Sequence, residues 1–202
     1  GVIERMIGEL EAMDGGGALM NQGIHTIDLL QWLMGPVRRV TAYTRCIAHE
    51  RIEVEDTAAA TIEFANGALG TIACTTSMWP GHFRIVEISG TDGTVAMADQ
   101  KFFFWQFRNE TEADNEIRKE HIEFPAVSIG AANPSAGLTA DGHRENFAEF
   151  LRALDENRRP SIDGYESRKA VQIILAIYES ARTGRTIELP APPSPAPRPS
   201  RA

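Results

Sequence analysis

The stretch Asp14–Gly35 reads DGGGALMNQGIHTIDLLQWLMG and joins a run of three glycines to a helical pattern. Apolar residues recur in it at the spacing of one helix face, at Ile24, Ile27, Leu30 and Leu33. This stripe predicts a helix over residues 18–34 that packs on a core. Gly35-Pro36 predicts its end, because Gly commonly follows a helix C-terminus and Pro cannot continue the helix.

The same helix carries a polar face. Asn21 and His25 are four residues apart and Asp28 follows three later, so their side chains are neighbours on a helix surface, with Gln22 beside them. Such a group on an anchored helix suits binding of a small ligand. For His25 the alternative is a core histidine, and for Asp28 a helix-packing carboxylate.

The glycine run predicts a tight turn rather than a phosphate loop. No strand precedes Gly15–Gly17, and the run lacks the Gly-x-Gly-x-x-Gly spacing of a dinucleotide site.

After Pro36 the apolar pattern changes to period two, which is typical of strands. Asn66-Gly67 separates two such runs and predicts a type I′ hairpin turn. A short strand at 121–125 is a further candidate. Successive strands with short turns indicate a mainly antiparallel sheet. The predicted strands are 37–47, 56–64, 68–77, 83–89, 94–98 and 101–107.

Residues 108–120 and 128–140 are predicted to be loops, and helical spacing returns over 141–154 and 166–183, with Gly184 as a C-cap. This order predicts an α+β fold, in which helices cover one face of an open antiparallel sheet. The strands at 57–62 and 68–76 carry small and β-branched residues, so the other face is available for dimerisation. A solvated, threonine-rich face is the alternative.

Charge and composition exclude several kinds of partner. The 202 residues carry a net charge of −8 without a basic cluster, so we expect no nucleic-acid partner. No apolar run has the length of a membrane span. Cys46 and Cys74 are expected to be buried free thiols, which favours a cytoplasmic location. The histidines show no cluster spacing, so we expect no metal site.

Four runs of this sequence resemble the C-terminal domain of the Gfo/Idh/MocA oxidoreductases. They are GGGALMNQGIHTIDLLQWLMG at 15–35, EDTAAATIEFANGALGTIACTTS at 55–77, IVEISGTDGTVAM at 85–97, and the closing run at 142–189. The resemblance implies a C-terminal domain like that of glyceraldehyde-3-phosphate dehydrogenase over 14–189. Residues 1–13 are then an N-terminal helical remnant, and 190–202 a Pro-rich disordered tail.

Family membership also implies roles for single residues. In the family motif Asp-x-Gly-x-His the histidine matches His25, which implies proton transfer, and Asn21 stands at the Asp position. An amide cannot act as a base, so Asn21 is left with orienting the substrate by hydrogen bonds. Asp28 and Gln22 become substrate-binding candidates, and Asp28 also a group that fixes the imidazole tautomer.

Three residues outside this helix are secondary substrate-binding candidates. Trp79 follows a strand end and has the aromatic face that suits a sugar ring, with a core tryptophan as the alternative. Arg84 is a possible anchor for a carboxylate or phosphate on the substrate. His143 begins a helix that often approaches the pocket in this family, with a capping or packing role as the alternative.

The resemblance implies the substrate-binding and oligomerisation domain of an NAD(P)-dependent oxidoreductase. Its substrate would be a sugar, sugar derivative or polyol, oxidised at a CH–OH group by a homodimer or homotetramer. NAD or NADP would be bound mainly by an N-terminal Rossmann domain that we expect to be absent here, so the isolated chain should be inactive and hold no cofactor-binding residues. Alternatives are an NAD-dependent glycoside hydrolase-type relative and a non-catalytic sugar-binding or dimerisation module.

Overall fold

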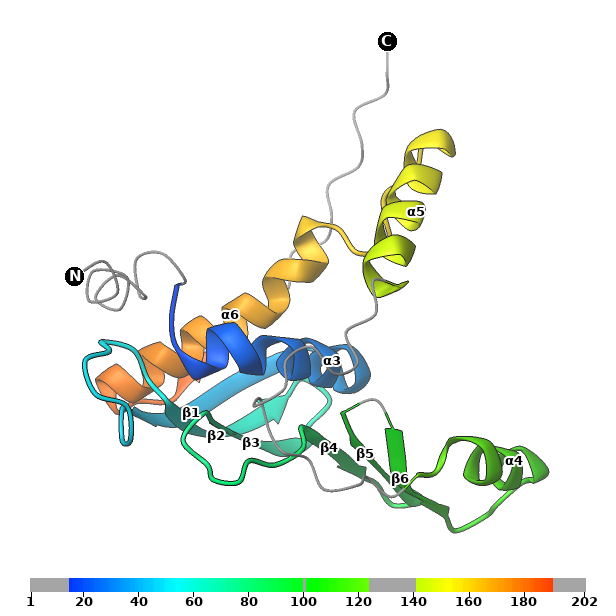
Figure 1. Ribbon diagram of the computed structural model, residues 1–202, viewed down its shortest axis with the longest axis horizontal. Coiled ribbons are helices and arrows are strands. Elements are labelled where there is room, and N and C mark those ends of the chain that lie inside the picture. Colours follow the sequence, from blue (N-terminus) through cyan, green and yellow to red (C-terminus); the bar gives the residue numbers. More distant parts are fainter. Residues whose placement is uncertain (1–14, 100, 124–140, 191–202) are drawn as a thin grey trace. The chain divides into compact units, whose positions relative to one another are not determined.

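The computed structural model describes residues 15–99, 101–123 and 141–190 (Figure 1). The predictions for 1–13, for 128–140 and for the tail beyond Pro190 lie outside these residues. The chain divides into two compact units, each described here by itself. The first unit comprises Gly1–Ser77 with Gly137–Ala202, and the second comprises Met78–Ala136.

The first unit contains a four-stranded antiparallel sheet in the order β3-β2-β1-β7. Within it, Ala42 pairs with Ala60 and Ala60 with Ile72, so small and β-branched side chains of neighbouring strands share one face. The strands are β1 (Val37–Arg45), β2 (Thr57–Phe64), β3 (Leu69–Thr75) and β7 (Ile187–Glu188).

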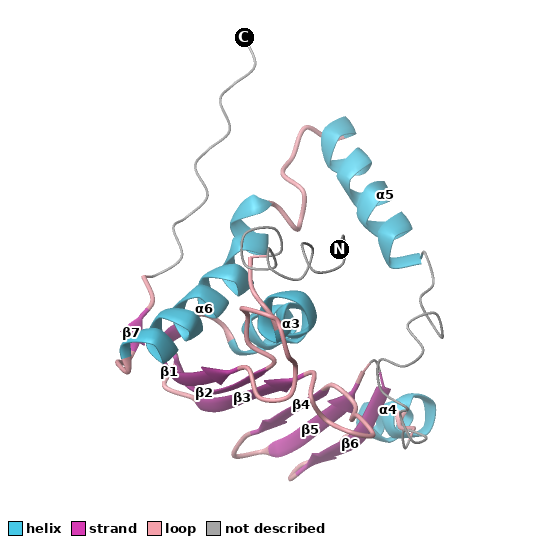
Figure 2. Ribbon diagram, turned by 60° about the vertical axis from the view of Figure 1, so that its left-hand side comes forward, coloured by secondary structure: helices cyan, strands magenta, loops and turns pink. Residues whose placement is uncertain are grey.

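Two helices cover one face of this sheet (Figure 2). They are α3 (Ile24–Met34), which continues from the π-helical turn η1 (Leu19–Gly23), and α6 (Gly164–Thr183). Burial of apolar side chains between the two layers is the main stabilising term of this unit. The buried members of the core are Leu19, Ile27, Val37, Val40, Ala42, Ala58, Ala60, Ile62, Phe64, Ala170, Ile173, Ile174, Ala176 and Ile177.

The opposite sheet face carries side chains that are exposed in this chain. Strand alternation places Thr41, Tyr43, Ala59, Thr61 and Ala73 on this face. Apart from Tyr43, they are small or β-branched, as the sequence predicts. A further helix, α5 (Asp141–Asp155), also belongs to the first unit.

The second unit contains a three-stranded antiparallel sheet in the order β4-β5-β6 and one helix. Its elements are β4 (Ile85–Ser89), β5 (Gly93–Ala98), β6 (Lys101–Phe107) and α4 (Glu112–His121). The α+β class and the antiparallel pairing predicted from the sequence are therefore confirmed, while the strands are divided between two sheets rather than joined in one.

Helix α4 contradicts the prediction of a loop over 108–120. The helix is polar on all sides, so it lacks the apolar stripe from which helices are predicted. It begins instead at a capping box, in which the Asp114 carboxylate accepts hydrogen bonds from the backbone N–H and hydroxyl of Thr111, both at 2.7 Å. The candidate strand at 121–125 is reduced to one parallel bridge between Ile122 and Phe102, and its last two residues lie outside the described part.

Several local predictions are corrected by the backbone. Gly67 has φ 88° but Asn66 is not at positive φ, so the turn is not type I′, which needs positive φ at both central residues. Leu33 is 44% exposed, because α3 turns it away from the core. The end of α3 at Gly35 and the Gly184 C-cap, with φ 68°, are confirmed.

The cysteines are both free, as predicted, but differ in burial. Cys74 is partly buried on β3. Cys46 is exposed, contrary to the prediction, because β1 ends at Arg45 and the chain turns into the loop 46–56. None of the helices in the described ranges is long and apolar enough to span a membrane.

Candidate functional site

The predicted site helix is formed by η1 and α3, and its polar residues are exposed on it. Asn21, Gln22, His25 and Asp28 all have exposed side chains, so His25 is not a core histidine. The Gln22 Nε2 donates to Asn21 Oδ1 at 3.4 Å. Neither the His25 imidazole nor the Asp28 carboxylate has a hydrogen-bond partner within residues 15–99, 101–123 and 141–190, so no bond from Asp28 fixes the imidazole tautomer. These four side chains are available to a ligand.

A buried carboxylate holds the beginning of this helix. Glu55, 8% exposed, accepts hydrogen bonds from the Leu19 N–H at 2.8 Å and from the Gly17 N–H at 3.1 Å. The Ala18 N–H donates to the Glu55 carbonyl oxygen at 2.9 Å. Because the first N–H groups of a helix have no partners within it, Glu55 supplies the acceptors that this terminus needs.

Tyr178 of α6 completes the cluster around Glu55. Its hydroxyl donates to Glu55 Oε1 at 3.0 Å and lies 3.3 Å from the Gly17 nitrogen, which donates to it. Burial, together with the negative charge of Glu55, raises the pKa of Tyr178 far above its usual value, so the phenol keeps its proton and remains a donor.

The glycine run fits tightly against these two side chains. Gly15 has φ 74°, and Gly16 has φ 154° and faces the Tyr178 ring. A Cβ at Gly17 would collide with the Glu55 carbonyl oxygen. Glycine is required here for left-handed backbone and for close approach. The run is a turn packed on Glu55 and Tyr178, and the N–H groups of Gly17 and Leu19 are already bonded, which leaves no cradle for phosphate at this helix start.

The neighbouring residue, Asp56, organises the loop that leads into β2. Its carboxylate is 1% exposed and accepts hydrogen bonds from the backbone N–H groups of Ile47, Ala48 and His49, at 2.8 to 3.0 Å. Burial raises the pKa of Asp56, but the N–H groups outweigh burial and hold it well below the usual range. The ionised carboxylate therefore fixes the loop directly before Glu55.

The other predicted site residues are not on this helix. Trp79 is 91% exposed, so it is not a core tryptophan, and it belongs to the second unit. Arg84, also in the second unit, directs its Nε at Asp99 Oδ1 over 2.9 Å. His143 is exposed on α5. The structure therefore brings Asn21, Gln22, His25 and Asp28 together on one helix. Trp79 and Arg84 belong to the second unit, and His143 lies on α5.

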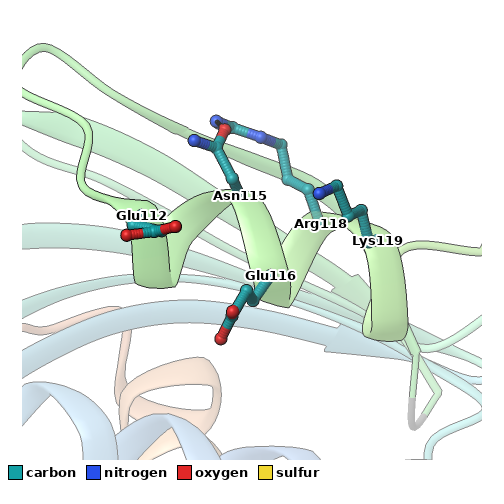
Figure 3. A pocket seen from close by; sticks show the side chains of 5 residues that line it. All are labelled: Glu112, Asn115, Glu116, Arg118 and Lys119. Atoms are coloured by element: carbon teal, nitrogen blue, oxygen red, sulfur yellow. Dashed lines mark hydrogen bonds between the residues drawn. The ribbon is translucent and has the colours of Figure 1, made fainter.

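A surface hollow of the second unit lies against α4, and none of the predicted site residues lines it. It is lined by Glu112, Asn115, Glu116, Arg118 and Lys119 (Figure 3). The Arg118 guanidinium donates to Glu110 and, at 2.7 Å, to Asn115 Oδ1. The Arg118 charge is neutralised within the unit, so Lys119 is the cation of the hollow that has no ion-pair partner within the described residues. Within the described residues, no group of three or more His, Cys, Asp or Glu side chains is placed to hold a metal ion.

Glu55 and Tyr178 are site-forming residues that sequence reasoning missed. The acidic pair Glu55-Asp56 stands directly before a strand, which is one available signal. Tyr178 is part of the apolar stripe of its helix, and nothing in that pattern points to its hydroxyl contact across 123 residues.

Comparison with known proteins identifies the domain. The family model described as "GFO/IDH/MocA C-terminal domain" matches residues 8–96. The resemblance to this family that the sequence predicts is confirmed over these residues.

Individual relatives give the same assignment. The D-apiose dehydrogenase of Rhizobium rhizogenes is 25% identical over 181 residues, covering 84% of this chain and 48% of the relative. The D-xylose 1-dehydrogenase (NADP(+)) 2 of Haloferax volcanii is 24% identical over 174 residues, covering 86% of this chain and 48% of the relative. Among solved structures, the WlbA dehydrogenase of Bordetella pertussis in complex with NADH and UDP-GlcNAcA matches with a TM-score of 0.71 and 34% identity, covering 87% of this chain and 49% of that one. The chain thus spans about half the length of the curated relatives it matches.

Proposed function

We propose that this chain is the substrate-binding and oligomerisation domain of an NAD(P)-dependent oxidoreductase that acts on a CH–OH group of a sugar, sugar derivative or polyol. The observation that carries the proposal is the exposed polar face of η1 and α3, with His25 and Asn21 one turn apart, within a domain of this family. The named relatives, which are dehydrogenases of D-apiose and D-xylose, support a sugar as the substrate class.

In this mechanism His25 accepts the proton of the substrate hydroxyl. Its imidazole is exposed, and neutral imidazole offers a ring nitrogen that serves as a base near neutral pH. Asn21 has an amide that donates and accepts hydrogen bonds, so it orients the sugar without taking a proton. A nicotinamide cofactor, when bound, accepts the hydride that leaves the carbon bearing this hydroxyl.

The described residues of this chain do not fit a nicotinamide dinucleotide by themselves. Its glycine run is packed on Tyr178 and Glu55, and the first helix N–H groups are bonded to Glu55, so no site for a pyrophosphate remains there. We therefore propose that NAD or NADP is bound mainly by residues of the whole protein other than the described ones. This chain would then supply the residues that bind the substrate.

Asn21 favours one alternative activity. Where the family motif has a carboxylate, this chain has an amide whose Oδ1 accepts from Gln22. This amide leaves room for an enzyme that uses bound NAD for glycoside cleavage rather than for net oxidation. Net reduction of the cofactor during turnover distinguishes oxidation from this alternative.

The test is turnover by the whole protein that contains this chain, supplied with NAD⁺ or NADP⁺ and with D-apiose or D-xylose. His25→Ala should lower kcat by roughly a hundredfold or more, because general base catalysis contributes that much, while substrate binding changes little. His121→Ala removes an exposed histidine of α4 and should leave kcat unchanged. Unchanged kcat in His25→Ala would instead favour a non-catalytic sugar-binding module.

We also propose that the exposed face of β1–β3 forms the contact between copies in a homodimer or homotetramer. This face is rich in small and threonine side chains, and its charged residues Arg39, Glu63 and Arg45 lie toward the strand ends. Sedimentation equilibrium should then give a mass that is a multiple of the monomer mass, and a monomer at micromolar concentration would oppose the proposal. The free thiols suit the reducing cytoplasm, which we propose as the location, and we propose neither nucleic acid nor membrane as a partner.

A further inference from the structure

We propose that Glu55 is a positioning residue for the reaction: its carboxylate, held by Tyr178, fixes the π-helical turn that sets Asn21 against His25. This inference rests on the proposed function for the roles of Asn21 and His25. It adds a residue that touches neither substrate nor cofactor and acts through the backbone of the site helix.

The hydrogen bonds of Glu55 converge on the residues directly before Asn21. Its two oxygens accept the N–H groups of Leu19 and Gly17, at 2.8 and 3.1 Å, and its carbonyl accepts the N–H of Ala18 at 2.9 Å. Three consecutive N–H groups at this helix start are therefore bonded to one residue of a different element. Asn21 lies two residues after Leu19, and its own N–H donates to the Gly17 carbonyl at 3.0 Å.

The conformation of this segment makes the position of Asn21 sensitive to that anchor. Residues Leu19–Gly23 form a π-helical turn, and α3 starts at Ile24. A π-helical turn contains an extra residue relative to an α-helical turn, and such turns are frequent at functional sites. Relaxation of these residues to α-helix would rotate them about the helix axis relative to α3. Asn21 and His25, four residues apart, would still share one face, but the distance and angle between their side chains would change.

Tyr178 keeps the carboxylate in the position that this turn requires. Its hydroxyl, a donor at 3.0 Å from Glu55 Oε1, comes from α6, which packs on both α3 and the sheet. Cys74 of β3 also touches this segment, with its thiol donating to the Ala18 carbonyl at 3.5 Å. The anchor of the site helix is thus built from the loop before β2, from β3 and from α6, and Glu55 within it is buried.

The experiment compares Glu55→Gln, Tyr178→Phe and the control Glu50→Gln in the whole protein. Gln keeps the size of Glu but offers one acceptor oxygen, so either Leu19 or Gly17 loses the acceptor that the Glu55 side chain supplies. Glu50 is an exposed carboxylate of the preceding loop. We expect kcat with NAD⁺ or NADP⁺ and the active sugar to fall roughly tenfold or more in Glu55→Gln, with KM within about threefold, because misplaced catalytic groups slow the chemical step. Glu50→Gln should match the wild type.

A second readout does not depend on turnover. In two-dimensional NMR spectra of the folded protein, the Asn21 side-chain amide and His25 imidazole signals should move in Glu55→Gln and, less far, in Tyr178→Phe. A carboxylate with a purely structural role would lower the melting temperature and leave these signals and kcat of the folded fraction in place, which would overturn the proposal. If Glu55→Gln does not fold, Tyr178→Phe decides by the same criterion.

The two proposals fail in different ways. Wild-type protein that reduces no cofactor with any sugar refutes the proposed function, while the NMR comparison still tests whether Glu55 fixes the turn. Active wild type with unchanged kcat and unchanged site signals in folded Glu55→Gln leaves the proposed function intact and removes Glu55 from it.

Discussion

Asp56 in the first unit and Asp114 in the second use the same chemistry in different surroundings. Each carboxylate accepts backbone N–H groups at the start of a segment, from residues 47–49 for Asp56 and from Thr111 for Asp114. Asp56 is 1% exposed, whereas Asp114 is accessible to water. Water can replace a lost partner only at the exposed site, so the same bonds should differ greatly in their contribution to stability.

The same contrast extends to other polar contacts of the two units. Around the site helix the carboxylates Glu55 and Asp56 are themselves buried and bond to backbone N–H groups. In the second unit the ion pairs Arg84–Asp99 and Lys101–Glu123 lie on the surface. Buried polar contacts specify one backbone arrangement, and we expect the geometry of the candidate site to depend on them.

The largest expected effect is that of Asp56→Asn. In Asn, an NH₂ group replaces one of the two carboxylate oxygens of Asp56. This NH₂ group would face backbone N–H groups of Ile47, Ala48 or His49, which would lose their acceptor at a buried side chain. We expect the free energy of unfolding to fall by about 3 kcal/mol. Urea denaturation at neutral pH measures this change.

The matched control for Asp56→Asn is Glu50→Gln, which neutralises an exposed carboxylate in the same loop and should change stability by less than about 0.5 kcal/mol. Equal losses for the two variants would show that burial does not distinguish them, and the comparison between the two units would then lose its basis.

Much of the fold is predictable because it follows from side-chain periodicity. Strands β1 to β3 alternate between core and surface, and α6 has a broad apolar stripe, so their existence and order follow from local patterns. Helix α4 has no such stripe. It is specified by the Thr111–Asp114 capping box and by the Trp105 indole, which donates to Asp114 at 2.9 Å. Those contacts involve few residues, and the pattern over 108–120 reads as a loop.

The candidate site divides in the same way. That Asn21 and His25 share a helix face is a consequence of spacing, and their exposure agrees with it. The contact of Glu55 with Tyr178 joins elements that are 123 residues apart. Such pairing is decided by how α6 packs on the sheet, which periodicity does not determine. Sequence therefore predicts the groups that face the ligand better than the groups that hold them in place.

A smaller, pH-dependent effect is expected for Asp114. Hydrogen bonds from the Thr111 hydroxyl, then from the Trp105 indole and the Thr111 N–H, lower the pKa of Asp114 from its usual 3.8 to about 2. A carboxyl whose pKa is lower in the folded state contributes stability above its unfolded pKa and loses it as pH falls through the folded value. The advantage of wild type over Asp114→Asn should therefore be full above about pH 5 and shrink between about pH 4 and pH 2.

Urea denaturation of wild type and Asp114→Asn at several pH values tests this. Asp92→Asn, at an exposed turn of the same unit, is the control, and its difference from wild type should lack this pH profile. A constant difference between wild type and Asp114→Asn from pH 6 to pH 2 would contradict the role given to the charged form of Asp114.

The smallest effect on stability is expected for Arg84→Ala. The Arg84 and Asp99 side chains are 55% and 42% exposed, so their ion pair at 2.9 Å is solvated on both sides. Such pairs contribute on the order of 0.5 kcal/mol or less, and salt screens them further. The variant should unfold at nearly the same urea concentration as wild type, and the difference should vanish in high salt. If Arg84→Ala instead lowered the free energy of unfolding as much as Asp56→Asn, the surface ion pairs of the second unit would stabilise it as strongly as the buried carboxylates stabilise the first unit. Because Arg84 is also a candidate substrate anchor, a raised KM at unchanged stability would assign the Arg84 charge to substrate binding rather than to the fold.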